Sequence, residues 1–481
     1  MPTTSQSVEE TRARLASVGQ EHLLRFVDEL SEPQRAGLLA QIDALPLDEL
    51  PRLIDTYVRA AAEPEPIGDV TPPSYYPYDA GERGHIWDRD AYTKRGEDLI
   101  RAGKIATFTV AGGQGSRLGH DGPKGTYKLG AITGKPLFQF FAEIVKASSD
   151  RYDVAIPWYI MTSPLNHEDT IAFFEANGFW GLPRGDVMFF PQGVMPSLDA
   201  QTGRILLTDK HMVATNPDGH GGSLRALIER GAIDDMKRRG VEHFCYHQVD
   251  NAHCMTIDPA FIGLHAAAPD SSAEISSKML PKAEPKEKVG LFTKEHARIK
   301  VIEYSDLPDE IAEQTEPDGT LRFRCGSIAI HQFSVAFVEK LWNDPGFELP
   351  YHRAIKKVPH VDLETGQRVE PENANAVKLE RFVFDALPRA ERSIIYETDR
   401  VLEFAPVKNA TGVDSAESAR LLQTERSARW LEAAGVTVPR KPDGAPDCVI
   451  EISPLTALDA GQLAQRDDLP GSIEPGAELS L

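Results

Sequence analysis

The feature that most constrains the fold is a short apolar run that stops at a cluster of glycines. Residues 105–110 read I-A-T-F-T-V, and five glycines follow between residues 111 and 124. A β-branched run bounded by glycines is typical of a buried parallel strand. Glycine lets the backbone turn tightly and lets N–H groups approach a ligand closely. Because Arg117 and Lys124 lie in the same loop, we predict a polyphosphate site at the carboxyl end of this strand.

Two common phosphate-binding loops do not match this stretch. The P-loop requires G-x-x-x-x-G-K-[ST], a spacing that is absent here. The dinucleotide fingerprint requires G-x-G-x-x-G, but after Gly113 and Gly115 the next glycine is Gly119, one residue too late. This glycine spacing argues against a nicotinamide-dependent oxidoreductase, which is therefore the weakest of the functions considered.

Length and charge limit the possible partners. The chain has 481 residues and a formal net charge of −21, which suits one large domain with smaller appendages and argues against non-specific nucleic-acid binding. Its four cysteines show no framework spacing, which favours a reducing compartment. The N-terminal residues do not resemble a signal peptide, and no apolar run reaches the roughly 18 residues of a membrane span. We therefore expect a cytoplasmic protein without membrane contact.

The pattern of elements predicts three regions. Residues 1–95 read as helices followed by a proline-rich arm, with an S-x-x-Q capping box at residues 31–34. Strands and helices alternate through residues 96–405, which is typical of a doubly wound α/β domain. Residues 406–481 are predicted to form a C-terminal module that starts with a helix over 419–434, opened by Asp414 as its cap.

Two further segments carry related chemistry. The second glycine-rich loop, N-P-D-G-H-G-G at 216–222, is typical of a turn and cap, or of a wall for a base or sugar. Residues 243–251 read H-F-C-Y-H-Q-V-D-N, a strand that ends in an acid. Asp250 at this end can hold Mg²⁺, which takes one or two carboxylates together with nucleotide phosphates. The histidines and cysteines here also allow a zinc site, which a strand packed against helices disfavours.

The first loop, G-G-x-G-[ST]-R-L-G followed by P-K, resembles the signature of the nucleotide-sugar pyrophosphorylases, as spelled in the UDP-N-acetylglucosamine pyrophosphorylases. Similar motifs follow in the family's order: P-[ND]-G-x-G-G at 217–222, V-D-N at 249–251, E-P-x-E-x-V-G at 284–290, V-x-E-Y-S at 301–305, E-x-F-V-F-D at 380–385 and E-F-[SA]-P-x-K-N-A at 403–410. The resemblance covers roughly residues 20–455. It implies a Rossmann-like mixed sheet of the nucleotide-diphospho-sugar transferase, GT-A-like class. A helical N-terminal appendage and a small β-rich C-terminal module would complete the chain.

The resemblance also implies uridylyl transfer: UTP and a sugar 1-phosphate give a UDP-sugar and pyrophosphate, with Mg²⁺ on Asp250. The implied catalytic cations are Arg117, Lys124 and Lys408. The implied nucleotide contacts are Ala111, Gly112, Gly113, Gly115, Gln192, Gly219 and Asp250. The implied sugar contacts are His220, Gly221, Asn251, Gly290, Glu303, Ser327, Phe382 and Phe384. We expect a monomer or a weak homo-oligomer with no nucleic-acid partner.

Three residues depart from the family's pattern. His220 and Ser327 each replace the usual asparagine, and Lys128 stands where an acidic residue is more usual. Serine is shorter than asparagine and offers fewer hydrogen-bond donors, so more than one sugar 1-phosphate is considered as the substrate. N-acetylglucosamine 1-phosphate is the first prediction, with glucose 1-phosphate or a broad sugar range as the alternative. A nucleotide-sugar binder that has lost catalysis is the alternative from another class.

Overall fold

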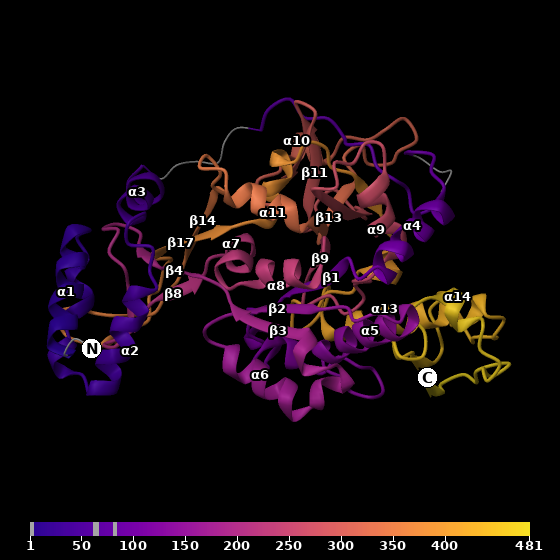
Figure 1. Cartoon of the computed structure of the whole chain (residues 1–481), viewed down its shortest axis with the longest axis horizontal. Coiled ribbons are helices and arrows are strands. Elements are labelled where there is room, and N and C mark those ends of the chain that lie inside the picture. Colours follow the sequence, from indigo (N-terminus) through magenta and orange to yellow (C-terminus); the bar gives the residue numbers. More distant parts are fainter. Residues whose placement is uncertain (1–3, 61–66, 80–83) are drawn as a thin grey trace. The chain divides into compact units, whose positions relative to one another are not determined.

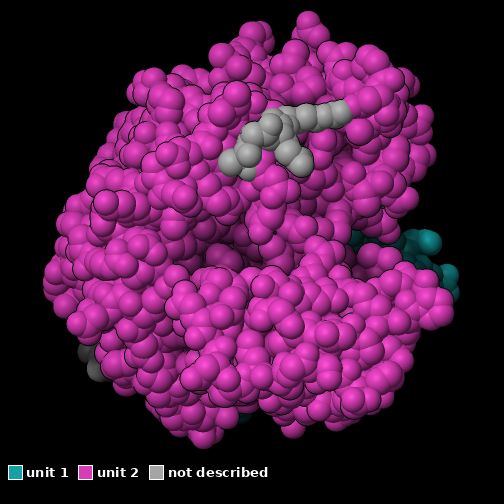
Figure 2. Space-filling model, turned by 90° about the vertical axis from the view of Figure 1, so that its right-hand side faces the viewer, with its two compact units in different colours: residues 1–67, 192–223, 348–383 teal, residues 68–191, 224–347, 384–481 magenta. Residues whose placement is uncertain are grey.

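The computed structural model describes residues 4–60, 67–79 and 84–481. The chain forms two compact units. Unit 1 comprises residues 1–67, 192–223 and 348–383, and unit 2 comprises residues 68–191, 224–347 and 384–481 (Figure 2). Unit 1 draws on three parts of the sequence because two later segments pack with the N-terminal helices. The predicted domain boundaries after residues 95 and 405 remain a prediction.

Unit 2 is built on a mixed sheet that has nine strands within the described residues (Figure 1). Along the main path the order is β12 (Arg298–Ile302), β11 (Gly290–Glu295), β13 (Cys325–Ser334), β9 (His243–Gln248), β1 (Ile105–Val110), β2 (Trp158–Thr162) and β3 (Val187–Pro191). β10 (Ile275–Pro281) pairs with β13, and β18 (Ile395–Glu397) pairs with β10. β9, β1, β2 and β3 are mutually parallel, whereas β13 runs antiparallel to β9. The prediction of a mixed α/β fold is therefore confirmed.

The predicted strand 105–110 is β1, and it lies inside the sheet between β2 and β9. A strand with parallel neighbours on both sides is covered on both faces, which explains its nearly continuous burial. Its polar side chains are used internally: the Thr109 hydroxyl accepts from Trp158 Nε1 at 2.8 Å and lies 2.8 Å from His247 Nε2. The carboxyl end of this strand is consequently held in a rigid frame.

Helices cover both faces of the parallel strands. On one face, Phe141 of α5 (Leu137–Tyr152) packs on His247 with ring centroids 4.7 Å apart. On the other, Asp235 of α8 (Ala232–Arg239) accepts a 2.7 Å hydrogen bond from Tyr159 of β2. Further helices of this unit are α4 (Arg89–Arg101), α6 (His167–Ala176), α7 (Gly222–Glu229, which begins in unit 1), α9 (Pro259–Ala267), α10 (Asp309–Ala312), α11 (Val335–Trp342) and α12 (Arg400–Glu403). In the described part of the chain, no helix is both long and apolar enough to span a bilayer.

The C-terminal part of unit 2 corrects one prediction. Helix α13 runs from Ala416 to Ala433, and its cap is Ser415, whose hydroxyl accepts from Ser418 N at 3.2 Å. Asp414 is therefore not the cap. After α13, β19 (Val449–Glu451) pairs in parallel with β20 (Glu478–Ser480), and α14 (Ala460–Leu463) lies between them in sequence.

Unit 1 combines helices with short antiparallel strands. Its helices are α1 (Thr4–Ser17), α2 (Glu32–Asp43) and α3 (Leu50–Leu53). The capping box predicted at residues 31–34 is present at the start of α2. The strands form four small sheets: β14 (Tyr351–Lys356), β17 (Ala376–Arg381) and β5 (Leu198–Asp199); β4 (Val194–Pro196) with β8 (Thr215–Pro217); β6 (Leu207–Asp209) with β7 (Met212–Val213); and β15 (His360–Val361) with β16 (Arg368–Val369).

Candidate functional site

The first glycine loop follows β1 directly and is held from two sides. The Asn166 side-chain amide donates to the carbonyls of Ala111 and Gly113 at 3.2 and 3.3 Å. The backbone N–H of Lys124 also donates to Gly113, at 3.0 Å. The N–H groups of Gly112 and Gly113 have no acceptor among the described residues. A loop fixed through its carbonyls, with donors left over, is suited to bind phosphate oxygens.

The tight part of the loop needs its glycines. A Cβ on Gly115 would lie 2.7 Å from the His120 side chain, and Gly119 has a φ of 67°. Between them, residues Ser116–Leu118 form a 3₁₀ turn. This turn carries Arg117, which is exposed and forms no hydrogen bond or ion pair with the described residues. Arg117 is thus free to contact an anionic ligand.

A cluster of charges lies at the carboxyl ends of β1 and β9. Lys124 Nζ is 3.4 Å from Asp250 Oδ2, and both side chains are largely buried, with 16% and 10% of their surfaces exposed. Burial opposes ionisation of Asp250, but the charges of Lys124 and Lys408 outweigh it, and the pKa of Asp250 is lowered. The structure therefore brings three of the predicted residues together around one ionised carboxylate.

Asp414 joins this cluster, a position that its predicted role as a helix cap did not reveal. Its backbone oxygen accepts from Lys408 N at 2.6 Å and from Asn409 N at 2.9 Å. Burial and the charge of Asp250 raise the pKa of Asp414, while Lys408 opposes the rise. Asp414 also has a φ of 58°, which is uncommon for a residue with a side chain. The turn thus holds the backbone of Lys408 and adds a second carboxylate.

Asn251 connects the end of β9 to the segment that carries Lys408. Its amide nitrogen donates to Glu403 O at 2.7 Å, and its amide oxygen accepts from Ala405 N at 3.0 Å. Next to it, Val407 N donates to the backbone oxygen of Asp250 at 2.9 Å. The Asn251 amide therefore positions the backbone that leads to Lys408. Its predicted sugar contact remains a prediction.

Three of the predicted sugar contacts lie side by side at the other end of the sheet. Gly290 of β11 is paired with Ser327 of β13. A Cβ on Gly290 would lie 2.8 Å from Val301 Cγ1 and 3.5 Å from Glu303 Oε1. Phe384, a fourth predicted residue in this unit, is 5% exposed. Gly290 is therefore required because the Val301 side chain packs against it, and Ser327 and Glu303 lie beside it.

In unit 1, the second glycine loop packs against the end of β17. A Cβ on Gly219 would lie 2.3 Å from Arg381 O, and one on Gly221 would lie 2.6 Å from Arg381 C. Gly221 N also donates to Arg381 O at 2.8 Å. Gln192, predicted to contact the base, is 4% exposed and begins the turn before β4. The glycines are required because the backbones touch, which the sequence did not show.

Three rings stack beside this loop. Phe382 lies between His220 and His352, with centroid distances of 5.0 and 4.1 Å and interplanar angles of 13° and 25°. Val383 N donates to His220 Nδ1 at 3.1 Å, so the ring proton of neutral His220 is on Nε2. Burial, with a smaller effect of His352, lowers the pKa of His220 to about 4. His220 and Phe382, both predicted sugar contacts, therefore form one neutral surface, to which the structure adds His352.

Comparisons with known proteins identify the family of the chain. The family model described as UTP–glucose-1-phosphate uridylyltransferase matches residues 82–443. The chain belongs to this family. It is 35% identical to UDP-N-acetylhexosamine pyrophosphorylase-like protein 1 of Xenopus tropicalis, over 94% of this chain and 93% of that protein.

Two further proteins are similar to the chain over most of its length. The UDP-N-acetylglucosamine pyrophosphorylase of Saccharomyces cerevisiae is 36% identical, over 74% of this chain and 75% of that protein. The crystal structure of the uridine diphosphate N-acetylglucosamine pyrophosphorylase of Trypanosoma brucei, solved with an inhibitor, matches with a TM-score of 0.82 and 26% identity. It covers 97% of this chain and 98% of that one.

The charge cluster can hold Mg²⁺ only if a substrate supplies some of the ligands. Within the described residues, no group of three or more His, Cys, Asp or Glu side chains is placed to hold a metal ion. Asp250 is ionised and has Asp414 in its electrostatic environment. Mg²⁺ accepts one or two carboxylates when substrate phosphates and water complete its octahedron. The donor set therefore fits a metal that arrives with a nucleotide.

Proposed function

We propose that the protein is a uridylyltransferase that converts UTP and N-acetylglucosamine 1-phosphate into the UDP-sugar and pyrophosphate. The observation that carries this proposal is the ionised Asp250, which Lys124 contacts at 3.4 Å and whose pKa Lys124 and Lys408 lower despite burial, beside a loop with unpaired N–H groups. Phosphoryl chemistry depends on positioning and charge neutralisation more than on a covalent intermediate. Membership of the family supplies the reaction class.

In the proposed mechanism, an oxygen of the sugar phosphate attacks the α-phosphorus of UTP in line with the leaving pyrophosphate. The N–H groups of Gly112 and Gly113 hold the phosphates, with Ala111 and Gly115 shaping the loop. Arg117 and Lys124 stabilise the negative charge that develops on the leaving group. Lys408 neutralises the incoming sugar phosphate as a point charge.

Asp250 is the residue that would hold Mg²⁺, and Asp414 interacts with it electrostatically. When bound, the metal would neutralise charge on the phosphates. Because Lys124 keeps the pKa of Asp250 low despite burial, the carboxylate is available in its charged form near neutral pH. The lysine thus prepares the ligand as well as contacting the phosphates.

The nucleoside and the sugar are proposed to contact the remaining predicted residues. The proposed uracil contacts are Gln192 and Gly219. The proposed sugar contacts are His220, Gly221, Asn251, Gly290, Glu303, Ser327, Phe382 and Phe384. We also propose that the fold belongs to the nucleotide-diphospho-sugar transferase, GT-A-like class and that the protein acts in the cytoplasm.

A direct assay tests the reaction and the acceptor together. Pyrophosphate release from UTP is measured in parallel with the 1-phosphates of N-acetylglucosamine, N-acetylgalactosamine and glucose. We expect the first to give the highest kcat/KM. Release with none of them, in a chain that binds UTP, would make the protein a nucleotide-sugar binder and overturn the proposal.

Ser327 favours glucose 1-phosphate as a second candidate, because its short side chain next to Gly290 offers fewer donors than asparagine. The variant Ser327→Asn decides how much this position matters. If Ser327 sets the preference, the ratio of kcat/KM for N-acetylglucosamine 1-phosphate over glucose 1-phosphate should rise about tenfold in the variant. An unchanged ratio would remove Ser327 from the specificity argument.

A further inference from the structure

Unit 2 contains a cavity outside the charge cluster, with a volume of ≈ 520 Å³. Its wall is formed by parts of α4, α9, α12 and α13 and by the segment just before α14. Lys124, Asp250 and Lys408 do not belong to this wall. Figure 2 shows that unit 2 is hollowed on the face viewed from the α13 and α14 side of Figure 1. A cavity of this volume is in the range of small-molecule sites.

Arg426 of α13 lines the cavity as a buried charge without a carboxylate partner. Only 9% of the surface of Arg426 is exposed. Within the described residues Nε has no acceptor, and Nη1 reaches only the carbonyl of Leu402, at 3.5 Å. The guanidinium lies over the Trp430 ring, 5.2 Å from its centroid. A buried charge is costly unless it is paired, so this guanidinium lacks the anion that would complete its environment.

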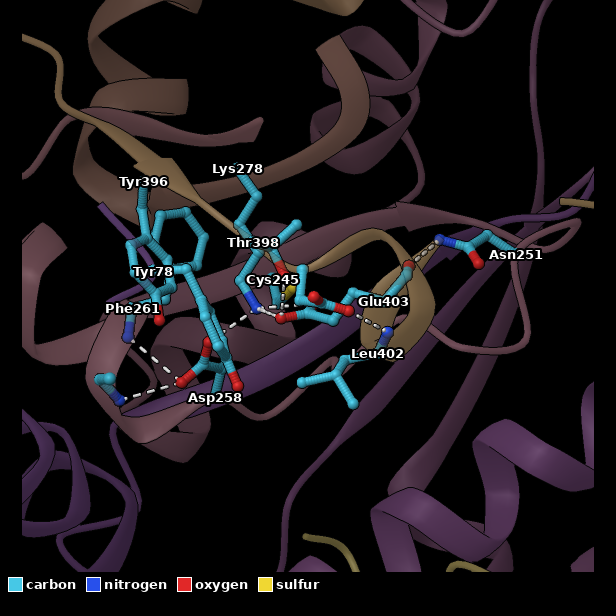
Figure 3. A network of polar contacts seen from close by, with 12 residues as sticks. Tyr78, Cys245, Asn251, Asp258, Phe261, Lys278, Tyr396, Thr398, Leu402 and Glu403 are labelled. Carbon is cyan, nitrogen blue, oxygen red and sulfur yellow. Dashed lines mark hydrogen bonds and ion pairs between the residues drawn. The ribbon is translucent and has the colours of Figure 1, made fainter. Parts of the chain in front are cut away.

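The other charges around the cavity are matched. Three pairs neutralise its outer wall: Arg151–Asp459 at 2.7 Å, Arg429–Asp399 at 3.5 Å and Arg101–Glu97 at 3.1 Å. At the inner wall, Lys278 Nζ lies 2.6 Å from Asp258 and 2.7 Å from Glu403 (Figure 3). Asp258 also attracts Arg89: burial lowers the pKa of Arg89, but Tyr396 and Asp258 raise it by more. Glu403 attracts Arg426 as well, but its ion pair is with Lys278, so Arg426 has no ion pair with any described residue.

His253 supplies a second polar atom without a partner. It is 2% exposed, and its Nδ1 lies 3.1 Å from the Val401 carbonyl, which can only accept. The proton of the ring is therefore on Nδ1, and Nε2 carries a lone pair that no described residue satisfies. Burial and the charge of Arg426 lower the pKa of His253 well below its usual value, so the ring stays neutral. Nε2 can accept a hydrogen bond from an O–H or N–H of a ligand.

The rest of the wall is largely apolar. It includes Met255, Ile257, Trp430 and Ile452. A cavity with mostly apolar walls and a few polar groups is typical of small-molecule sites. The polar atoms define the ligand more narrowly: an acid group for Arg426, a donor for His253 and an apolar body between them.

We propose that this cavity is a binding site for a small organic anion, whose carboxylate or phosphate pairs with Arg426 and whose hydroxyl or N–H group donates to His253. The apolar body of the ligand packs on Trp430. Arginine suits this role because its planar fork matches both carboxylate and phosphate.

The site is connected to the charge cluster through the backbone. His253 follows Asp250 by three residues, and Leu402 and Glu403 precede Lys408 on the same segment. Asn251 links the two segments through its bond to Glu403 O (Figure 3). A ligand that pairs with Arg426 therefore acts on the segment that positions Lys408. This regulatory effect, unlike the binding, rests on the proposed function.

Titration calorimetry on the full chain tests the binding. The probes are 4-hydroxybenzoate, which has a carboxylate, a hydroxyl donor and a ring; phenyl phosphate, which presents a phosphate on the same ring; and phenol, which has no anion. We expect one equivalent of at least one anion to bind, and phenol to bind at least about tenfold more weakly. No heat with either anion at up to about 10 mM would overturn the proposal.

Variants test whether the heat measured by calorimetry comes from binding in the cavity. Arg426→Gln should weaken binding at least about tenfold. The control Arg429→Gln, on the same helix and wall but already paired, should change it by no more than about threefold. Leu458→Trp fills the cavity without changing a charge and should also abolish binding, which keeps the test valid if Arg426→Gln misfolds. Wild-type affinity in Leu458→Trp or in folded Arg426→Gln would refute the site.

The proposed anion binding and the proposed enzymatic function can be refuted independently of each other. The calorimetry contains no UTP and no sugar phosphate, so a chain that releases no pyrophosphate can still bind the anion. In an active chain, the bound probe should change the kcat of pyrophosphate release in wild type and not in Arg426→Gln. An equal change in both would show that the probe acts at the nucleotide site and would overturn the regulatory effect.

Discussion

Lys124 is the side chain whose removal tests the proposed mechanism most sharply. Lys124→Met keeps the length of the side chain and removes the charge that lies 3.4 Å from Asp250 Oδ2. At an effective dielectric constant of about 20, two unit charges at this distance attract by about 5 kcal/mol before desolvation. A phosphate oxygen at a similar distance has a comparable gross attraction.

Only the part of this attraction that grows in the transition state affects kcat. Losing one preorganised donor elsewhere costs about 10²-fold or more in kcat, and 10²-fold is about 2.7 kcal/mol. That loss is about half of the gross attraction, so the structure can supply it. We expect Lys124→Met to lower kcat for pyrophosphate release by about 10²-fold or more.

The variant should also change the pH dependence. Burial raises the pKa of Asp250 and the two lysines lower it, so removing Lys124 lets burial raise the pKa. A folded-state pKa that rises moves the loss of the charged carboxylate to higher pH. The acidic limb of the kcat/KM profile should therefore shift to higher pH in Lys124→Met, and less in Lys124→Arg, which keeps the charge.

Lys128→Met is the matched control, because Lys128 is an exposed lysine of the same loop. It changes the net charge equally without removing a contact to Asp250, and kcat should stay within about threefold of wild type. Turnover near the wild-type value in Lys124→Met, or an equal loss in Lys128→Met, would refute the role given to Lys124.

Three other predictions concern metal binding, stability and pH. Asp250→Asn should raise the Mg²⁺ concentration for half-maximal activity about tenfold or more; an unchanged metal dependence would remove Asp250 as a ligand. Lys278→Met should lower the free energy of unfolding in urea by about 3–5 kcal/mol, because it leaves two carboxylates buried without their partner. The exposed control Lys286→Met should stay within about 0.5 kcal/mol, and equal midpoints for the two variants would contradict the assignment. Burial lowers the pKa of His220 from 6.5 to about 4, so the unfolded state binds the proton first and stability falls as the pH drops through this window. Between about pH 6.5 and pH 5, the free energy of unfolding should fall by about 1.5 kcal/mol less in His220→Asn than in wild type. Parallel curves of unfolding free energy against pH for the two proteins would refute this.

Local sequence was sufficient for the elements whose signals are local. The run 105–110 is β1 at the predicted residues. The capping box at 31–34 is also present. These predictions succeeded because periodicity, β-branching and capping act within a few residues. Asp414 failed as a cap because Ser415, one residue later, already supplies the hydroxyl for the helix.

The sequence by itself determined the mixed α/β class, the glycine loop after β1 and the acid at the end of β9. Only the tertiary structure decided that Asp414 joins Asp250 and Lys408, that His352 extends the stack on Phe382, and that Arg426 lines a cavity without a carboxylate partner. The physical reason is how far apart in the sequence the interacting residues lie. A strand or a cap is set by neighbouring residues, whereas the charge on a buried side chain is matched or unmatched only when segments far apart in the chain meet.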